Sequence, residues 1–165
     1  MKMQPDNGRA GPPSRLMDGI AAVEFGLMAP MLLILLTGVG EIGIAAYQRM
    51  QVQAAVEAGA LYAVKHPPAS TSDTTGLNAI GVAVTSGTAS TGITASPAPT
   101  SFCGCPAAAG VVSQGTDCTT VCSLDSKAPG KYVLVNAAIT HTTLLPYLSL
   151  PLPATLTASS TVRVK

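Results

Sequence analysis

The chain has 165 residues, a formal net charge of +1 and only 10% charged residues. This length allows one modest folded domain beside a membrane helix and excludes a multidomain architecture. The chain has no run of basic residues and no Trp, so it lacks the charged and aromatic surface on which nucleic-acid binding depends, and we expect no nucleic-acid partner.

Residues 1–18 contain several prolines and glycines and show no apolar periodicity. Such a segment cannot bury a core, and we expect it to be disordered. Lys2, Arg9 and Arg15 precede the apolar stretch that follows, whereas only Arg49 lies close beyond it. The positive-inside tendency therefore predicts a cytoplasmic N-terminus.

An apolar run of 23 residues, 25–47, contains one acidic residue, Glu41. As a helix it spans roughly 34 Å, which is enough to cross a hydrocarbon core of about 30 Å. A secretory signal peptide is the competing interpretation, but its apolar region is shorter and its cleavage site follows the run. Here the candidate processing signal precedes the run, which favours a transmembrane helix.

That signal is the order Arg15, Gly19 and then IAAVEF, which leads directly into the apolar run. The order resembles the type IV prepilin signature, in which a membrane peptidase cuts after the glycine and the new chain has glutamate as its fifth residue. Glu24 is that fifth residue, and Phe25 stands where the small Flp-type pilins usually have tyrosine. The Glu-Phe version on a much longer chain resembles the TadE-like minor pilins, or pseudopilins, of tight-adherence pilus systems.

The resemblance implies cleavage by a prepilin peptidase between Gly19 and Ile20, followed by assembly with other pilin or pseudopilin subunits and the pilus machinery. It assigns assembly roles to Glu24, Phe25 and Glu41. It also implies an inner-membrane anchor with an extracytoplasmic C-terminal domain, a role in surface adhesion and no cofactor.

The two acids of the apolar region need partners or a route to water. A charge at the bilayer centre costs about 2.5–3.5 kcal/mol. Cleavage would place the new amine of Ile20 four residues from Glu24, where it can neutralise that carboxylate within one helix or between neighbouring subunits. The alternative is that Glu24 snorkels to the cytoplasmic headgroups. Glu41 is expected in the outer part of the bilayer, either paired or as a snorkelling or protonated carboxyl.

The helix is predicted to loosen near Gly26, because Pro30 removes a backbone donor, and to continue until Pro67 and Pro68 stop it. Beyond the membrane, small residues recur every three or four positions and form a narrow face that packs against the chain's own sheet or against a partner. The expected organisation is a prepilin leader (1–19), a transmembrane helix (20–47), a helical stalk (48–66) and a head domain (67–165).

The head is expected to be α+β. Asp73 is a candidate cap for a helix over 74–86. Alternating β-branched residues predict strands over 131–142 and 155–165 in an antiparallel hairpin, and residues 91–102 form a strand only if their prolines lie at an edge or bulge. The apolar connection of the hairpin is expected to complete the domain core or to lean on the membrane-proximal helix or another subunit. Its leucines are Leu144, Leu145, Leu148 and Leu150.

Four cysteines remain to be explained: Cys103, Cys105, Cys118 and Cys122. Zinc is one candidate, but C-x-C and C-x3-C are imperfect ligand pairs and no histidine is nearby. A domain beyond an N-in helix lies where oxidation is favoured, so we expect two disulfides and no metal site. A bridge within C-x-C would close a very tight ring. We therefore expect cross-pairing between the two cysteine pairs, with the connectivity left open.

The sequence offers little for an enzyme. His66 and His141 are isolated in the sequence, and neither a nucleophile elbow nor a glycine-rich phosphate loop is recognisable. We expect a non-enzymatic, pilin-like structural protein. The alternatives are an unprocessed, single-pass membrane-anchored periplasmic binding or interaction domain and a secreted protein released from its anchor.

Overall fold

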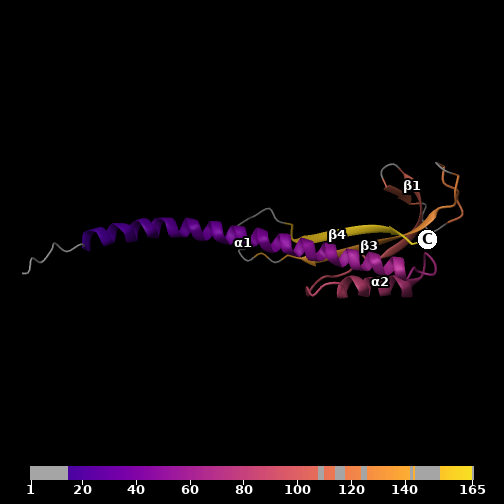
Figure 1. Cartoon of the computed structure of the whole chain (residues 1–165), viewed down its shortest axis with the longest axis horizontal. Coiled ribbons are helices and arrows are strands. Elements are labelled where there is room, and N and C mark those ends of the chain that lie inside the picture. The colour runs from indigo at the N-terminus through magenta and orange to yellow at the C-terminus, as the bar shows by residue number, and fades with distance from the viewer. Residues whose placement is uncertain are drawn as a thin grey trace, which may run out of the picture. The chain divides into compact units, whose positions relative to one another are not determined.

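The computed structural model describes residues 15–107, 110–113, 118–123, 126–141, 143 and 153–164. The elements follow in the order α1 (Arg15–Lys65), α2 (Thr74–Ser86), β1 (Thr100–Ala107), β2 (Gly110–Ser113), β3 (Gly130–Thr140) and β4 (Thr155–Arg163) (Figure 1). The chain forms two compact units, Met1–Gly40 and Glu41–Lys165. We call the second unit the head; it includes the part of α1 from Glu41 onward as well as the segment 67–165 predicted as the head domain. The predicted α+β architecture, with a long N-terminal apolar helix and a small antiparallel sheet, is confirmed.

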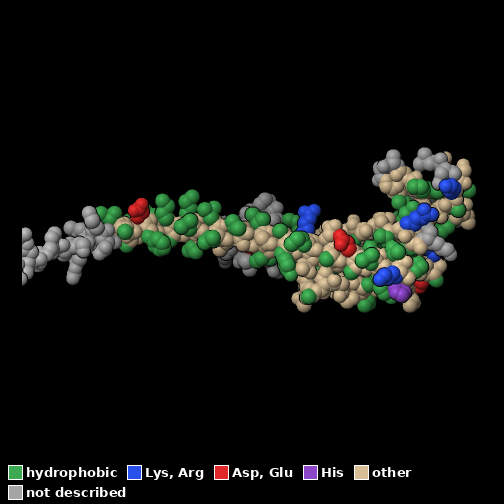
Figure 2. All heavy atoms as spheres, viewed as in Figure 1, with side chains coloured by type: hydrophobic (Ala, Val, Ile, Leu, Met, Phe, Trp, Pro, Cys, Tyr) green, Lys and Arg blue, Asp and Glu red, His purple; other side chains and the backbone are tan. Residues whose placement is uncertain are grey.

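Within the first unit, α1 begins at Arg15 rather than at Ile20, so the helix starts earlier than expected and continues through Pro30. Nearly all described side chains between 19 and 40 are exposed, including Leu27 at 76%. Figure 2 shows hydrophobic side chains covering this part of the helix. The helix is long and apolar enough to cross a membrane, and none of its most apolar window is buried.

Within the head, α1 presents a second and different face. Its buried positions recur every three or four residues, as one side of a helix requires. They are Glu41, Ala45, Val52, Ala55, Val56, Ala60 and Ala63. Most of these residues join the hydrophobic core that α2 and the sheet complete. The expectation that the small-residue face packs against the chain's own sheet is therefore confirmed, and α1 ends before Pro67 as predicted.

Gly59 marks the closest approach on this face. A Cβ at Gly59 would collide with the side chain of Val84 in α2 and lie 2.9 Å from Cγ1 of Val135 in β3. Only hydrogen therefore fits at this position, and the absence of a side chain lets the helix contact α2 and the sheet together.

The sheet has the order β2-β1-β3-β4, and every neighbouring pair is antiparallel. In the predicted hairpin, the pairing of β3 with β4 runs from Tyr132 opposite Arg163 to Thr140 opposite Thr155. The inward positions of β3 alternate as predicted and are all buried, namely Val133, Val135, Ala137 and Ile139. The predicted role of the apolar connection between these strands falls on residues 144–152, outside the described residues.

The N-terminal half of the sheet differs from the sequence-based expectation. Residues 91–99 contribute only an isolated bridge between Thr94 and Ala138, and β1 begins at Thr100. Pro97 and Pro99 lack the N–H groups that a ladder requires, so continuous pairing starts after them. The strand β2 was not predicted.

The disulfides link β1 to the segment before β3. Cys103 is bonded to Cys118 and Cys105 to Cys122, so all four cysteines are paired. The prediction of two cross-paired disulfides is confirmed, and the connectivity that the sequence left open is now assigned. The two disulfides hold the chain after β2 against β1. Because β1 is short and has few large apolar residues, the disulfides contribute stability that packing alone does not supply.

The helix α2 is capped by Asp73, as predicted. The Asp73 carboxylate accepts hydrogen bonds from the backbone N–H groups of Gly76 at 3.0 Å and Ala69 at 2.9 Å. These two bonds, with that of Gly76 the stronger influence, lower the pKa of Asp73 because they stabilise its charged form. The cap fixes the start of α2, so that Ile80 and Val84 enter the core on one face.

We predict that Gly59→Ala destabilises the head although alanine is the better helix former. Helix propensity alone favours the change by up to about 1 kcal/mol, but forcing a methyl group between Val84 and Val135 costs about 1–3 kcal/mol. Thermal unfolding of the full-length oxidised protein in detergent micelles, followed by circular dichroism, measures the difference. Gly43→Ala is the matched control, because Gly43 lies on the same helix with open space around it. A Gly59→Ala variant as stable as Gly43→Ala would contradict the close packing.

Candidate functional site

The residues predicted for processing and for part of the assembly role lie together on the N-terminal part of α1. Gly19, Ile20, Glu24 and Phe25 are all exposed. Ile20 and Glu24 are four residues apart on one helix, which makes them neighbours on its surface. Glu41, the third predicted assembly residue, lies in the other compact unit and has a different environment.

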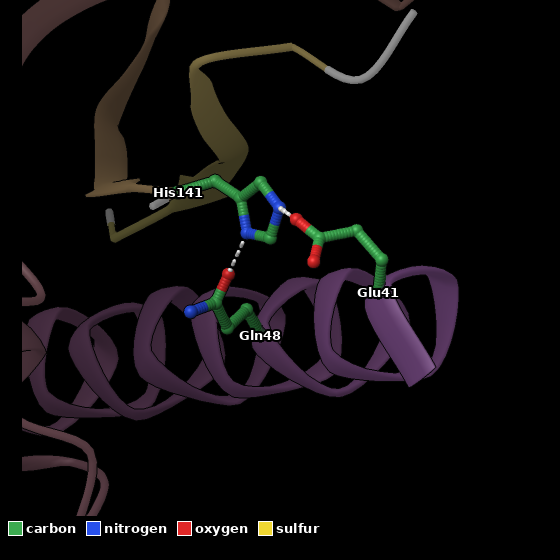
Figure 3. Close-up of polar contacts among 3 residues, drawn as sticks. All are labelled: Glu41, Gln48 and His141. Atoms are coloured by element: carbon green, nitrogen blue, oxygen red, sulfur yellow. Dashed lines mark hydrogen bonds and ion pairs between the residues drawn. The ribbon is translucent and has the colours of Figure 1, made fainter. Parts of the chain in front are cut away.

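Glu41 is buried, with 2% of its surface exposed, and its side chain faces His141. The carboxylate oxygen Oε1 lies 3.3 Å from Nε2 of the imidazole. On the other side of the ring, Nδ1 lies 2.6 Å from Oε1 of Gln48. Figure 3 shows the imidazole between the two α1 side chains, held from both sides.

Both partners are positioned by the regular patterns of their elements. Glu41 and Gln48 are seven residues apart, two turns along α1, and both belong to the side of the helix that packs into the head. His141 directly follows β3 and continues the series of odd-numbered positions that face the core. The backbone N–H of His141 donates to the carbonyl oxygen of Ala154 at 2.9 Å, which extends the ladder by one residue and fixes the direction of the ring.

The orientation of the Gln48 amide decides which ring nitrogen of His141 donates and which accepts. If Gln48 presents its oxygen to the ring, Nδ1 donates, and Nε2 needs either its own proton or a protonated Glu41. If the amide is turned, its nitrogen donates to Nδ1, and Nε2 carries the ring proton toward the carboxylate. Among the described residues Nε2 has no hydrogen bond of good geometry, and its 3.3 Å contact with Glu41 is an ion pair when the imidazole is protonated.

The position of the contact defines what it can do. It joins the first turn of the head part of α1 to the end of β3, two places that are distant in the sequence. Removing one member of a buried ion pair is costly. The hydrogen bond between His141 and Gln48 holds the imidazole in one orientation, which fixes how the helix and the strand are aligned. The contact is suited to aligning the helix with the sheet. Among the described residues, no group of three or more His, Cys, Asp or Glu side chains is arranged to hold a metal ion.

His141 is isolated in the sequence, as stated above, but in the structure its ring lies between Glu41 and Gln48. Two signals in the sequence could have revealed the contact between His141 and Glu41. Position 141 continues the alternating inward-facing positions of β3, and position 41 belongs to the buried face of α1. A buried polar residue at the end of each series needs a polar partner, and the two series end close to each other in the structure. The assembly role predicted for Glu41 stays a prediction.

These features describe a class of protein in which an exposed apolar helix continues into a small disulfide-linked α+β head. Residues 19–61 match the model of a protein family described as TadE-like protein. The resemblance stated from the sequence is thereby confirmed for that segment, which is typical of proteins associated with Tad pilus systems. Neither a curated protein nor a solved structure matches the chain.

We predict that His141→Leu destabilises the head by about 3–5 kcal/mol, because it leaves the buried Glu41 carboxyl without its imidazole partner. The double variant Glu41→Leu/His141→Leu recovers most of this loss, since two apolar side chains of similar size do not need each other's charge. Thermal unfolding of the oxidised, full-length protein in micelles compares the stability of the wild type, His141→Leu and the double variant.

The control is His66→Leu, which alters an exposed histidine and is expected to change stability by no more than about 0.5 kcal/mol. If the double variant is as unstable as His141→Leu alone, the two side chains are not coupled, and the contact has no energetic role.

Proposed function

We propose that the chain is a minor pilin, or pseudopilin, of a tight-adherence type IVb pilus, cut by a prepilin peptidase between Gly19 and Ile20 and acting in pilus assembly and surface adhesion. The observation that carries the proposal is where the family match starts. It begins at Gly19, the residue before the proposed cleavage point, and runs through the apolar helix into the head.

The exposure of the first unit supports a role in the membrane. One N-terminal apolar helix, compatible with a single-pass membrane anchor, is present. Residues 20–40 precede the head and, at about 1.5 Å per residue, extend about 31 Å, the thickness of a hydrocarbon core. The basic residues before the helix favour an N-terminus in the cytoplasm, with the head outside the inner membrane. The disulfides fit an oxidising compartment on that side.

Glu24 is the residue through which we propose that assembly is directed. It is exposed on a helix whose surroundings are apolar, such as Phe25 at 70% exposure. In a bundle of such helices a carboxylate is tolerated if it meets a positive charge. After cleavage the amine of Ile20 supplies that charge, on the same helix or on a neighbouring subunit, while Phe25 adds apolar contact area beside it.

We predict that the mature protein begins at Ile20. Mass spectrometry of the protein purified from cells that have an intact pilus system identifies its N-terminal peptide. A Gly19→Leu variant should keep its leader, because a bulky side chain replaces the exposed glycine at the cut, and Gly26→Leu serves as a control for an equally exposed glycine seven residues away. Mature protein that still carries Met1 would contradict the proposal and favour an unprocessed membrane-anchored interaction domain.

We also predict that Glu24→Ala protein inserts in the membrane and is processed but does not join the pilus assembly, because the charge that fixes its position among the other helices is gone. Co-purification with pilus subunits and surface adhesion of cells are the readouts, with membrane level and cleavage measured in parallel. Thr37→Ala is the control, since the Thr37 hydroxyl bonds only to the carbonyl groups of Leu33 and Ile34 in its own helix. Normal incorporation of Glu24→Ala would remove Glu24 from the assembly role.

A further inference from the structure

The head has an open polar cavity where α1, β4 and the segment before β1 meet. Its volume is about 410 Å³, which is within the range of small-molecule binding sites. In the register of the sheet, Asn136 of β3 lies directly opposite Ser159 of β4. An arginine and a glutamine line the cavity from α1, and amide and hydroxyl groups line it from the sheet and from the segment before β1. The polar lining residues are Arg49, Gln53, Ser96, Asn136, Thr157 and Ser159.

Among the described residues, Arg49 is the one that brings a charge to this cavity. It is exposed, and no ion-pair partner for it is found in the part of the chain that the structure describes. Its guanidinium is a planar set of donors that matches the oxygens of a phosphate or carboxylate group. The hydroxyls of Thr157 and Ser159 form no hydrogen bond with any described residue, so they are available to a ligand. The cavity therefore suits an anion that carries hydroxyl groups of its own.

A largely apolar groove on α1 adjoins the cavity, and the two share Arg49 and Gln53. Its one acid among the described residues, Glu57, is eight residues or about 12 Å along the helix from Arg49, too far to pair with it. The apolar residues of the groove begin at Ala46, on the side of Arg49 from which the apolar part of the helix approaches. A ligand that fills both places has a charged, hydroxylated end and an apolar end. The residues that line the groove are Ala46, Arg49, Met50, Gln53, Ala54 and Glu57.

We propose that this site binds an anionic phospholipid whose headgroup carries hydroxyl groups, such as phosphatidylglycerol. The phosphate lies against Arg49, the headgroup hydroxyls lie in the polar cavity, and the apolar part of the lipid lies along the groove.

The proposal rests on the proposed function in one respect, the membrane anchor. Arg49 is nine residues, or about 14 Å along α1, beyond Gly40. Side chains on a helix lean toward its N-terminus, and an arginine side chain is long enough to extend its charge toward the membrane. The guanidinium is thereby within reach of the headgroup layer, which is roughly 5–7 Å deep on each side of the bilayer. This position favours a lipid over a free phosphate ester.

The test is native mass spectrometry of the full-length, oxidised protein released from micelles that contain equal amounts of phosphatidylglycerol and phosphatidylcholine. The second lipid has the same acyl chains, but its headgroup has no net charge and no hydroxyl group. We expect the wild type to carry several-fold more phosphatidylglycerol than phosphatidylcholine. Arg49→Gln should remove most of this preference. The double variant Thr157→Val/Ser159→Ala should reduce it while every charge stays in place.

Lys65→Gln is the matched control, because it removes one positive charge from an exposed residue of the same helix that does not line the cavity. The basic residues before Gly19 attract anionic lipid equally in all variants, so a difference between variants reports the site. Thermal unfolding of each variant checks that its head is folded.

Equal binding of the two lipids by the wild type would overturn the inference, and so would an equal loss of preference in Arg49→Gln and Lys65→Gln. Complete displacement of the lipid by an equal concentration of glycerol 3-phosphate would also overturn it, because the cavity would then bind the free phosphate ester and the acyl chains would contribute nothing. Leader cleavage and incorporation into the pilus are measured separately, so each of these results leaves the proposed function intact.

Discussion

The packing of α1 against the sheet is the interaction on which the rest of the head depends. The sheet alone has one apolar face, formed by β3 and β4, and too few large side chains to be stable unless it is covered. Small residues on α1 allow close approach, Gly59 most of all, and α2 closes the side that α1 leaves open. The Glu41–His141 contact fixes the position of α1 on the sheet at one end. Apolar faces can slide past each other and permit several alignments, whereas a polar contact with a hydrogen-bonded imidazole permits one.

The same helix therefore serves three environments along its length. Its first part exposes apolar side chains nearly all round, which is compatible with a single-pass membrane anchor. From Glu41 onward it has one side in the head core and another, still apolar, side that is open. The head begins at Glu41, where a charged group finds its partner in protein rather than in lipid. Glu41 was expected either paired or as a snorkelling or protonated carboxyl, and in the structure it is the first residue of the head unit and lies against His141.

Most of the regular structure could be predicted from the sequence because it depends on local periodicity. The helix ending before Pro67, the Asp73 cap and the alternation in β3 are all properties of short windows. The remainder depends on contacts between distant segments. The strand that contains Cys103 and Cys105 has no alternating apolar pattern to reveal it, and its disulfide connectivity depends on how the distant segment with Cys118 and Cys122 lies against it. Likewise, the contact of His141 with Glu41 joins residues a hundred positions apart. It becomes predictable only when the buried face of α1 and the inward positions of β3 are considered together.

The head part of α1 is aligned on the sheet by the contacts of His141 with Glu41 and Gln48. Solid-state NMR of the full-length protein in lipid bilayers, with labelled histidine, glutamate and glutamine, tests it directly. The account predicts through-space correlations from one imidazole to a carboxyl carbon through Nε2 and to a side-chain amide through Nδ1. The chain has two histidines, and the exposed His66 provides the water-contacting reference in the same spectrum. A His141 signal with the shifts of His66 and no carboxyl correlation would contradict the account.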